Sequence, residues 1–215
     1  KGYFDMIAAA DDFVLYDDMQ FTKRDWRNRN KIKTAAGPAW LTVPVNVKGK
    51  FLQKINDTTI SDPSWAAQHW ASIVHAYARA PYFKEYSALF GELYSAGLSP
   101  YLSQVNFIFI KAICELLGKS PRFHWSSDFT LAEDRNERLV GICRELGATT
   151  YITGPRAKDY LDQPLFDQAG ITVNYFDFSG YPPYSQLHGE FIHEVTILDL
   201  LFNTGPEAKH YMKNF

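Results

Sequence analysis

Short apolar runs alternate with helical apolar stripes along this chain, and the alternation predicts an α/β fold. Continuous runs of strand-forming residues are typical of strands buried on both faces in a parallel sheet. Such runs lie at residues 13–16, 150–153 and 171–178. Residues 41–45 predict a further strand, which Pro44 places at a sheet edge or a strand end. Because strand, helix and strand follow one another in the last third, we expect a mostly parallel sheet flanked by helices.

Apolar residues at helical spacing predict the helices. They cover residues 3–10, three segments between 62 and 118, and residues 134–147, 154–161 and 196–203. In the middle block, Gly97 and Gly118 are predicted to end the second and third helices. We expect this block to form a helical lobe, at about residues 62–118, inserted into a single α/β domain spanning residues 1–215.

The composition supports a globular protein with a proper core. The 215 residues are 46% hydrophobic and 21% charged, and the net charge of −2 argues against whole-surface attraction to nucleic acid or anionic lipid. The longest apolar runs are a few residues, whereas a membrane span needs roughly twenty. We therefore expect no membrane insertion. The two cysteines, Cys114 and Cys143, fit a reducing compartment and predict a cytoplasmic location, with Cys143 in the core.

The first candidate site follows the predicted strand at 13–16, where Asp17 and Asp18 end the apolar run. In open parallel sheets the ligand crevice lies at the carboxyl ends of the strands. On an extended chain adjacent carboxylates point apart, so we expect one of the two to face the crevice. Six positive charges then follow between residues 23 and 33, mixed with amides and a tryptophan. The candidate ligand-binding side chains are Gln20, Lys23, Arg24, Trp26, Asn28 and Arg29.

That mixture suits an anionic ligand rich in hydroxyl groups, with arginines on phosphate and amides on hydroxyls. The alternative is a solvated basic loop, which most charge runs are. A second candidate segment follows the strand at 150–153 and opens a short helix, whose N–H groups face the same crevice. Its candidate residues are Thr153, Arg156 and Tyr160. We expect the two segments to converge on one anionic ligand.

A third candidate segment is the loop at residues 181–188, in which two prolines restrict the backbone. This loop holds Tyr184, Gln186 and His188 in place. His188 is the best general-base candidate, and a plain surface histidine is the alternative. Asp199 and Asn203 lie four residues apart on the last helix and predict a buried hydrogen-bonding pair. The sequence holds no zinc-ligand spacing and no standard phosphate loop, so we predict no metal site, and it identifies no cofactor.

The sequence resembles the WbqC-like protein family over essentially its whole length. The matching text includes Gly2-Tyr3-Phe4, Asp17-Asp18-Met19-Gln20-Phe21, Asn28-Arg29-Asn30, Leu41-Thr42-Val43-Pro44-Val45, Asp159-Tyr160-Leu161, Tyr184-Ser185-Gln186 and Asp199-Leu200-Leu201-Phe202-Asn203. Members usually carry a strand and a Gln-Pro-x-Tyr-Leu-Pro segment before the Gly-Tyr-Phe motif, and this sequence starts after that point.

The resemblance implies a role in bacterial surface-polysaccharide (O-antigen, lipopolysaccharide) biosynthesis. Our leading hypothesis is a transferase that attaches glycine or another amino-acid-derived acyl group to the amine of a nucleotide-linked amino sugar. Arginines would hold the phosphates, and Asp18 or His188, with Asp17 nearby, would take the proton of the amine. The alternatives are an RNA-binding module, with charged tRNA as acyl donor, and a non-catalytic partner of polysaccharide enzymes.

Overall fold

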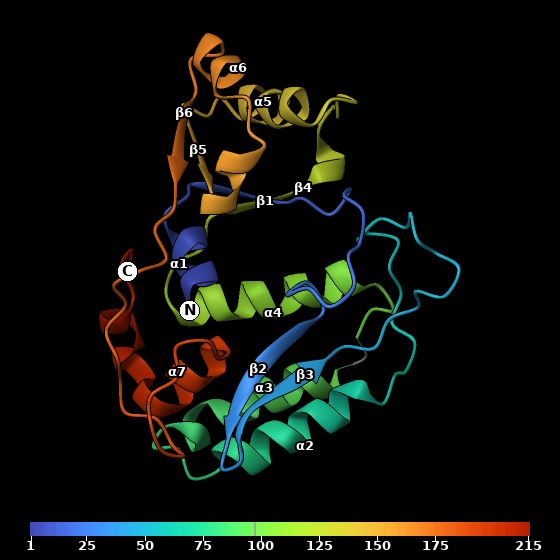
Figure 1. Cartoon of the computed structure of the whole chain (residues 1–215). Helices are drawn as coiled ribbons and strands as arrows, with labels where there is room; N and C mark the ends of the chain where they lie inside the picture. Colours follow the sequence, from blue (N-terminus) through green and yellow to red (C-terminus); the bar gives the residue numbers. More distant parts are fainter. Residues whose placement is uncertain (97) are drawn as a thin grey trace.

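The strands of the computed structural model pair in three separate two-stranded sheets rather than in one (Figure 1). The structure describes residues 1–96 and 98–215. Within these ranges the strands are β1 (Asp12–Leu15), β2 (Arg29–Thr34), β3 (Gly37–Thr42), β4 (Arg122–Trp125), β5 (Thr150–Thr153) and β6 (Thr172–Tyr175). The pairs β1–β4 and β5–β6 are parallel, and β2–β3 is an antiparallel hairpin.

Helices make up most of the regular structure. The α-helices of the described chain are α1 (Gly2–Ala8), α2 (Trp65–Tyr77), α3 (Phe83–Ser95), α4 (Leu102–Leu116), α5 (Arg135–Glu145), α6 (Gln163–Gln168) and α7 (Ile197–Thr204). Three 3-10 helices accompany them: η1 (Ser126–Asp128), η2 (Pro155–Asp159) and η3 (Gly205–Tyr211). The mixed α/β class is therefore confirmed.

Local chemistry explains where the predicted helices begin and end. The Asp134 carboxylate accepts hydrogen bonds from the backbone N–H groups of Asn136 and Glu137, at 2.8 and 2.9 Å, and so starts α5. Gly118 ends α4 with a φ of +74°, a left-handed conformation that glycine adopts without strain. The predicted stop at Gly97 lies outside the described residues.

Two sequence expectations differ from the structure. The basic segment at residues 23–33 is expected as a loop, but from Arg29 onward it belongs to the strand β2, whereas the strand expected at 41–45 is β3 and ends at Thr42. No single parallel sheet forms because the parallel pairs belong to different packing units. The β5–β6 pair packs with α5 and α6 on its own apolar cluster, which contains Val140, Cys143, Phe166 and Ile171.

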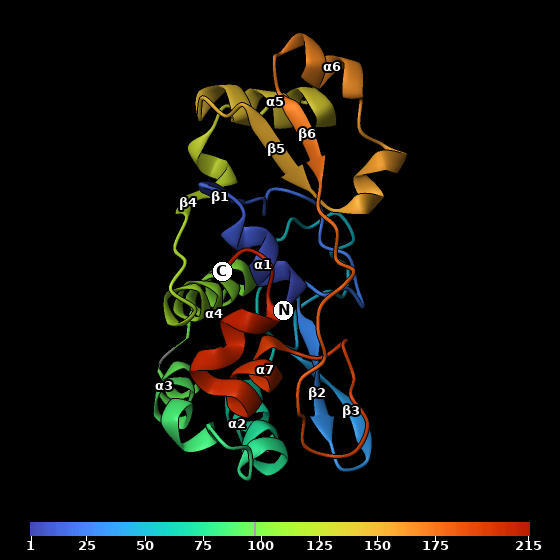
Figure 2. The same cartoon turned by 90° about the vertical axis from the view of Figure 1, so that its left-hand side faces the viewer.

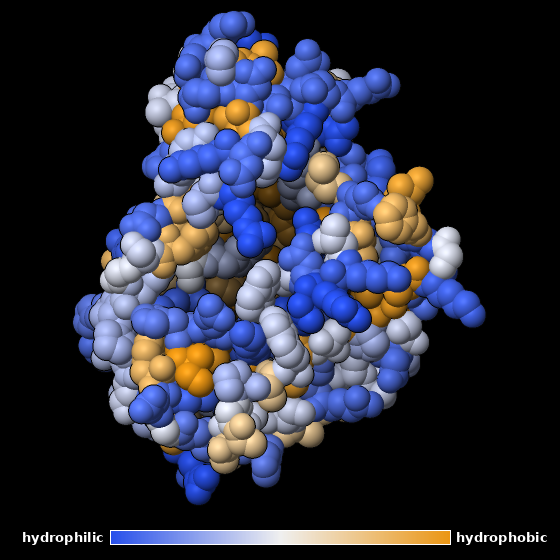
Figure 3. Space-filling view, in the orientation of Figure 1, coloured by the Kyte–Doolittle hydropathy of each residue, from blue (hydrophilic) through white to orange (hydrophobic). Residues whose placement is uncertain are grey.

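The molecule has an upper part with β5, β6, α5 and α6, and a larger lower part with α2, α3, α4, α7 and the β2–β3 hairpin (Figures 1 and 2). In the lower part, Tyr77, Phe90 and Phe202 lie at the centre of the largest apolar cluster. Between the two parts the surface is hollowed, with apolar side chains visible at the bottom (Figure 3). The 3-10 helix η2 lies at the upper edge of this hollow.

Candidate functional site

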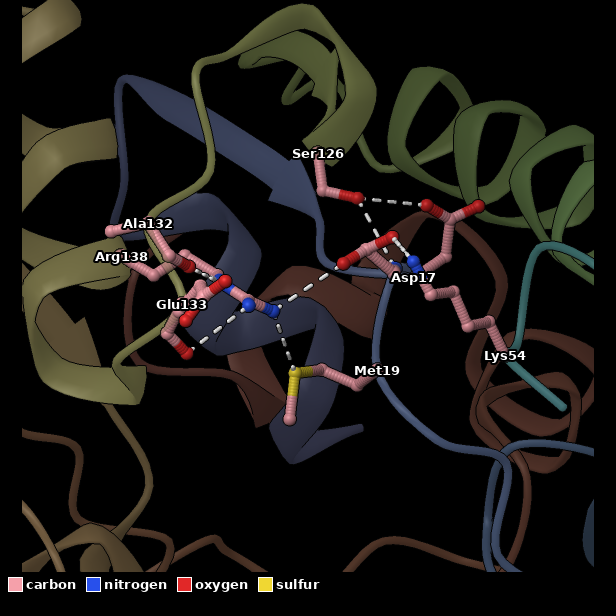
Figure 4. A network of polar contacts seen from close by, with 8 residues as sticks. Asp17, Met19, Lys54, Ser126, Ala132, Glu133 and Arg138 are labelled. Atoms are coloured by element: carbon pink, nitrogen blue, oxygen red, sulfur yellow. Dashed lines mark hydrogen bonds and ion pairs between the residues drawn. The ribbon is translucent and has the colours of Figure 1, made fainter. Parts of the chain in front are cut away.

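The ends of the parallel strands β1 and β4 are joined by one serine hydroxyl. Asp17 is buried, and its Oδ1 accepts a hydrogen bond from Ser126 Oγ at 3.0 Å. The backbone N–H of Asp18 donates to the same Ser126 oxygen at 3.2 Å (Figure 4). Ser126 opens η1 directly after β4. The two carboxylates at the end of β1 therefore have different surroundings, and within residues 1–96 and 98–215 only the Asp18 carboxylate pairs with cations.

Asp18 bridges a loop and a helix through its two oxygens. Lys54 Nζ lies 2.6 Å from Oδ1, and Arg138 Nη1 of α5 lies 3.3 Å from Oδ2 (Figure 4). The side chains of Asp18 and Arg138 are each 18% exposed, whereas that of Lys54 is 51% exposed. Lys54 reaches this place because residues 53–56 run alongside residues 17–21, with Ile55 N–H donating to the Met19 carbonyl at 2.9 Å.

The guanidinium of Arg138 is held firmly by its own surroundings. Its Nε donates to the Ala132 carbonyl at 2.7 Å, and Nη2 lies 3.4 Å from the Glu133 carbonyl. Nη1 also lies 3.8 Å from the Met19 sulfur. Asp17, Asp18, Lys54, Ser126 and Arg138 together form a polar centre at the end of β1, which we call the Asp18 centre.

The first turns of α5 connect the Asp18 centre to η2. The guanidinium of Arg135, one turn before Arg138, lies 3.4 Å from the centre of the Tyr160 ring. Asn136 accepts from the N–H of Asp162 at 3.1 Å, so the chain after η2 is fastened to the same turn. The first predicted segment, which contains Asp18, and the second, which contains Tyr160, are therefore connected through α5, a helix that belongs to neither segment.

A cavity of about 350 Å³ lies beside η2. Its lining residues are Thr153, Gly154, Pro155, Arg156, Ala157, Tyr160 and Phe178. All three residues predicted for the second segment are among them. Arg156 and Tyr160 are exposed, whereas Thr153 is buried. The volume lies at the lower end of the range for small-molecule sites. A cation, a phenol and an apolar wall thus meet at the upper edge of the hollow.

The predicted residues of the first segment divide into exposed and internally bonded groups. Lys23 and Arg24 are exposed, and Arg24 has a φ of +60°. Gln20 Nε2 donates to the Phe51 carbonyl at 2.8 Å. Asn28 is buried and its Nδ2 donates to the Val43 carbonyl at 2.9 Å. The two amides therefore fix the loop, and the exposed cations remain directed to solvent.

Trp26 and Arg29 belong to the outer surface of the hairpin. Trp26 is exposed, and its ring centre lies 5.2 Å from that of Trp40. The Arg29 guanidinium lies 4.1 Å from the centre of the Trp40 ring and donates to the Arg24 carbonyl. No contact within residues 1–96 and 98–215 joins Arg29 to Arg156. The expected meeting of the segments occurs at Asp18 and α5 instead.

The third segment lies in the core of the lower part. Asp199 of α7 is buried, and its Oδ1 accepts hydrogen bonds from Tyr184 Oη and Gln186 Nε2, both at 2.8 Å. Oδ2 accepts from Tyr77 Oη at 3.0 Å. Burial raises the pKa of the Asp199 carboxyl, while these donors oppose the shift. Asn203 is also buried, although its amide donates to the Asp199 backbone carbonyl, at 2.7 Å, and not to the carboxylate.

His188 lies at the C-terminal end of α2. Its Nε2 is 2.9 Å from the Ala76 carbonyl, which makes that nitrogen a donor, and its φ is +66°. Figure 1 places this end of α2 at the bottom of the molecule, far from the end of β1. The structure therefore does not bring His188 to the Asp18 centre, and its role as a base stays a prediction.

Sequence reasoning missed Lys54, Ser126, Arg135 and Arg138. For the two arginines a signal existed. The partial positive charge at a helix N-terminus disfavours cations there, yet α5 begins with Arg135 and has Arg138 on the same face. Cations at the N-terminus of a helix, where the dipole disfavours them, indicate a stabilising partner outside the helix. For Lys54 and Ser126 the sequence carries no such signal, because loop pairing brings them to Asp18.

Two properties of the described residues bear on metal binding and on membrane insertion. No group of three or more His, Cys, Asp or Glu side chains in these ranges is arranged to hold a metal ion. Among the same residues, none of the helices has the length and apolar character needed to cross a membrane.

The structure is that of a mixed α/β protein with a polar centre at the end of β1 and a cavity beside η2. The model of the WbqC-like protein family matches residues 1–211, and the chain belongs to this family. It is similar to "Uncharacterized protein Rv1507c" of Mycobacterium tuberculosis (strain ATCC 25618 / H37Rv), with 47% identity over 213 residues, 99% of this chain and 92% of the relative. No solved structure matches it significantly. Family membership suggests a role related to polysaccharide biosynthesis.

Proposed function

We propose that this protein is a transferase that attaches an amino-acid-derived acyl group, such as glycine, to the amine of a nucleotide-linked amino sugar. The observation that carries the proposal is the link through α5, which ties the Asp18 carboxylate to the cavity containing Arg156. A carboxylate and an exposed guanidinium that are connected through one helix suit an amine and a phosphate on the same substrate.

In this proposal Arg156 and the exposed Arg24 bind the diphosphate, and Tyr160 packs against the sugar or base. Both arginines are exposed, so binding does not require breaking a buried contact. Gln20 and Asn28, which bond to backbone carbonyls, position the loop and do not contact the substrate.

Asp18 accepts the proton that the amine loses as it attacks the acyl carbonyl. Lys54 is half exposed, so the neutral substrate amine displaces it from Oδ1 at little cost, while Arg138 stays on Oδ2. The new C–N bond forms, the bond from the acyl carbon to its leaving oxygen breaks, and the leaving oxygen takes up a proton. Holding both reactants together supplies several kcal/mol of the rate enhancement.

Calorimetric titration with a uridine diphosphate-linked amino sugar tests the binding step. Arg156→Gln should weaken binding about tenfold or more, because a charge-assisted hydrogen bond contributes about 1.5–3 kcal/mol. Arg144→Gln is the matched control, since Arg144 is an exposed arginine in the last turn of α5. It should leave the affinity unchanged.

The transfer step is tested with the same sugar and activated glycine as donor. Asp18→Asn should abolish amide formation while changing sugar affinity less than Arg156→Gln does. Absence of any sugar-nucleotide binding, or full transfer activity in the Asp18→Asn variant, would refute the proposed function.

A further inference from the structure

Two tryptophans stand side by side on the outer surface of the β2–β3 hairpin. Trp26 is 58% exposed and Trp40 is 43% exposed. Their ring centres lie 5.2 Å apart, and the planes are tilted by 50°. Large aromatic rings normally contribute their area to the core. Two neighbouring indoles in solvent therefore form a surface suited to a flat partner.

The pleat of β3 explains why Trp40 faces outward. Ala39 and Leu41 pack against the main apolar cluster, so Trp40 between them points away from it. The loop at residues 186–190 covers part of the hairpin, where its backbone carbonyls accept from Lys33 Nζ. Trp40 remains exposed beyond this cover.

Cations surround the indole pair. The Arg29 guanidinium lies 4.1 Å from the Trp40 ring centre, and Lys31 Nζ lies 5.1 Å from the same point and 6.0 Å from that of Trp26. Lys31 also pairs with exposed Glu194 at 3.2 Å, a surface contact that an anionic ligand can replace. Lys23 and Arg24 are exposed in the turn just before Trp26. We call Trp26, Trp40, Arg29 and Lys31 the indole surface.

We propose that the indole surface binds an unpaired segment of RNA, with bases stacked on the indoles and phosphates on the surrounding cations. Exposed aromatic rings interleaved with cations are how proteins bind single strands, since every base offers a flat face. A double helix keeps its bases stacked on one another, so it does not fit this surface equally well. The net charge of −2 restricts the footprint to a few phosphates.

This inference rests on the proposed function, because it names the acyl donor as an aminoacylated RNA 3′ end. The turn that carries Trp26 borders the hollow, and its Arg27 carbonyl accepts from Asn106 of α4 at 2.9 Å. An RNA end that crosses the indoles therefore reaches the hollow. There the sugar amine attacks the ester carbonyl, the amide C–N bond forms, and the ester C–O bond breaks. The ribose oxygen leaves with the proton that the amine gives up.

Fluorescence anisotropy with a labelled, unstructured RNA 12-mer tests the surface, with a blunt RNA duplex of the same length alongside. We expect the single strand to bind more tightly than the duplex. For three to four contacted phosphates, the logarithm of affinity should fall with that of salt with a slope of about −2 to −3. Trp26→Ala and Lys31→Gln should each weaken binding, the tryptophan change by about tenfold.

The matched controls lie on the neighbouring loop, where Phe51 is 81% exposed and Lys48 is also exposed. Phe51→Ala and Lys48→Gln should leave RNA affinity within about twofold of the wild type. Quenching of tryptophan fluorescence by the RNA provides a readout in the unmodified protein, independent of whether any variant folds. Stacking on the indoles requires such quenching.

Absence of RNA binding, equal binding of the duplex, or equal losses in the test and control variants would overturn the inference. Sugar-nucleotide titration separates this failure from failure of the proposed function. If the sugar still binds in an Arg156-dependent manner while RNA does not bind, the transferase proposal survives with a different acyl donor. If RNA binds and the sugar does not, the indole surface stands without that enzyme role.

Discussion

Replacing Arg138 by methionine should destabilise the protein much more than replacing Lys54 by methionine, although both cations contact the carboxylate of Asp18. Methionine keeps much of the side-chain volume in each case. The difference therefore reports how each cation is bound. Arg138 is largely buried on α5, whereas Lys54 is half exposed on a loop.

The magnitude follows from the hydrogen bonds that each change removes. Arg138 loses a 2.7 Å charged hydrogen bond to the Ala132 carbonyl and two longer contacts, to Asp18 and to the Glu133 carbonyl. A charged hydrogen bond contributes about 1.5–3 kcal/mol. We expect a loss of about 2–3 kcal/mol in the free energy of unfolding, because the longer contacts add little. Lys54→Met removes an exposed ion pair, which contributes about 0–1 kcal/mol.

Urea denaturation followed by circular dichroism measures both free energies of unfolding. The slope of free energy against urea should stay constant, so that the midpoint alone reports the change. Arg144→Met, at an exposed position of the same helix, should stay within about 0.5 kcal/mol of the wild type. Equal losses for Arg138→Met and Lys54→Met would show that the carbonyl contacts of Arg138 do not stabilise the fold.

Two further predictions concern pH. Burial lowers the pKa of His69, which lies 3.0 Å from the Thr42 carbonyl, so the unfolded chain binds a proton more readily than the folded protein. The free energy of unfolding should therefore fall as pH drops below about 6.5, and His69→Gln, which keeps a donor to Thr42, should flatten this dependence in urea titrations. Hydrogen bonding from Arg122 lowers the pKa of Asp12 to about 2. The stabilising contribution of the Asp12 carboxylate should therefore be lost as pH falls from about 4 towards 2. An Asp12 carboxyl resonance that titrates near 4 in nuclear magnetic resonance spectra would contradict this prediction.

Sequence patterns located the elements that depend on local chemistry. The apolar run at residues 13–16 predicted β1 within one residue, and the carboxylates after it are part of the Asp18 centre. The N-cap at Asp134 and the left-handed glycine at 118 marked helix ends for the same reason, since both act within one turn of the chain.

The strand β2 could not be predicted from its residues because its polar face is covered by a distant segment. Lys33 is 1% exposed, and its Nζ donates to Gln186 Oε1 at 3.0 Å and to the Glu190 carbonyl at 2.5 Å. From the sequence alone, a lysine in a charge run is expected in a solvated loop. Its acceptors lie more than 150 residues away in the sequence, so the local pattern does not indicate them. Only the tertiary fold provides those oxygens, and they allow a buried ammonium group in a strand.

The same reasoning explains why the contacts that connect the predicted site segments could not be foreseen from the sequence. Asp18 and Arg156 each follow a strand, and Arg156 lines the cavity beside η2, but no described contact joins Arg29 to Arg156. The join is made by Arg135 and Arg138, whose placement at the start of α5 opposes the helix dipole. Their partners, the Tyr160 ring and the Asp18 carboxylate, compensate for that opposition. In α5, the two cations at the helix N-terminus therefore mark the place where the two segments are connected.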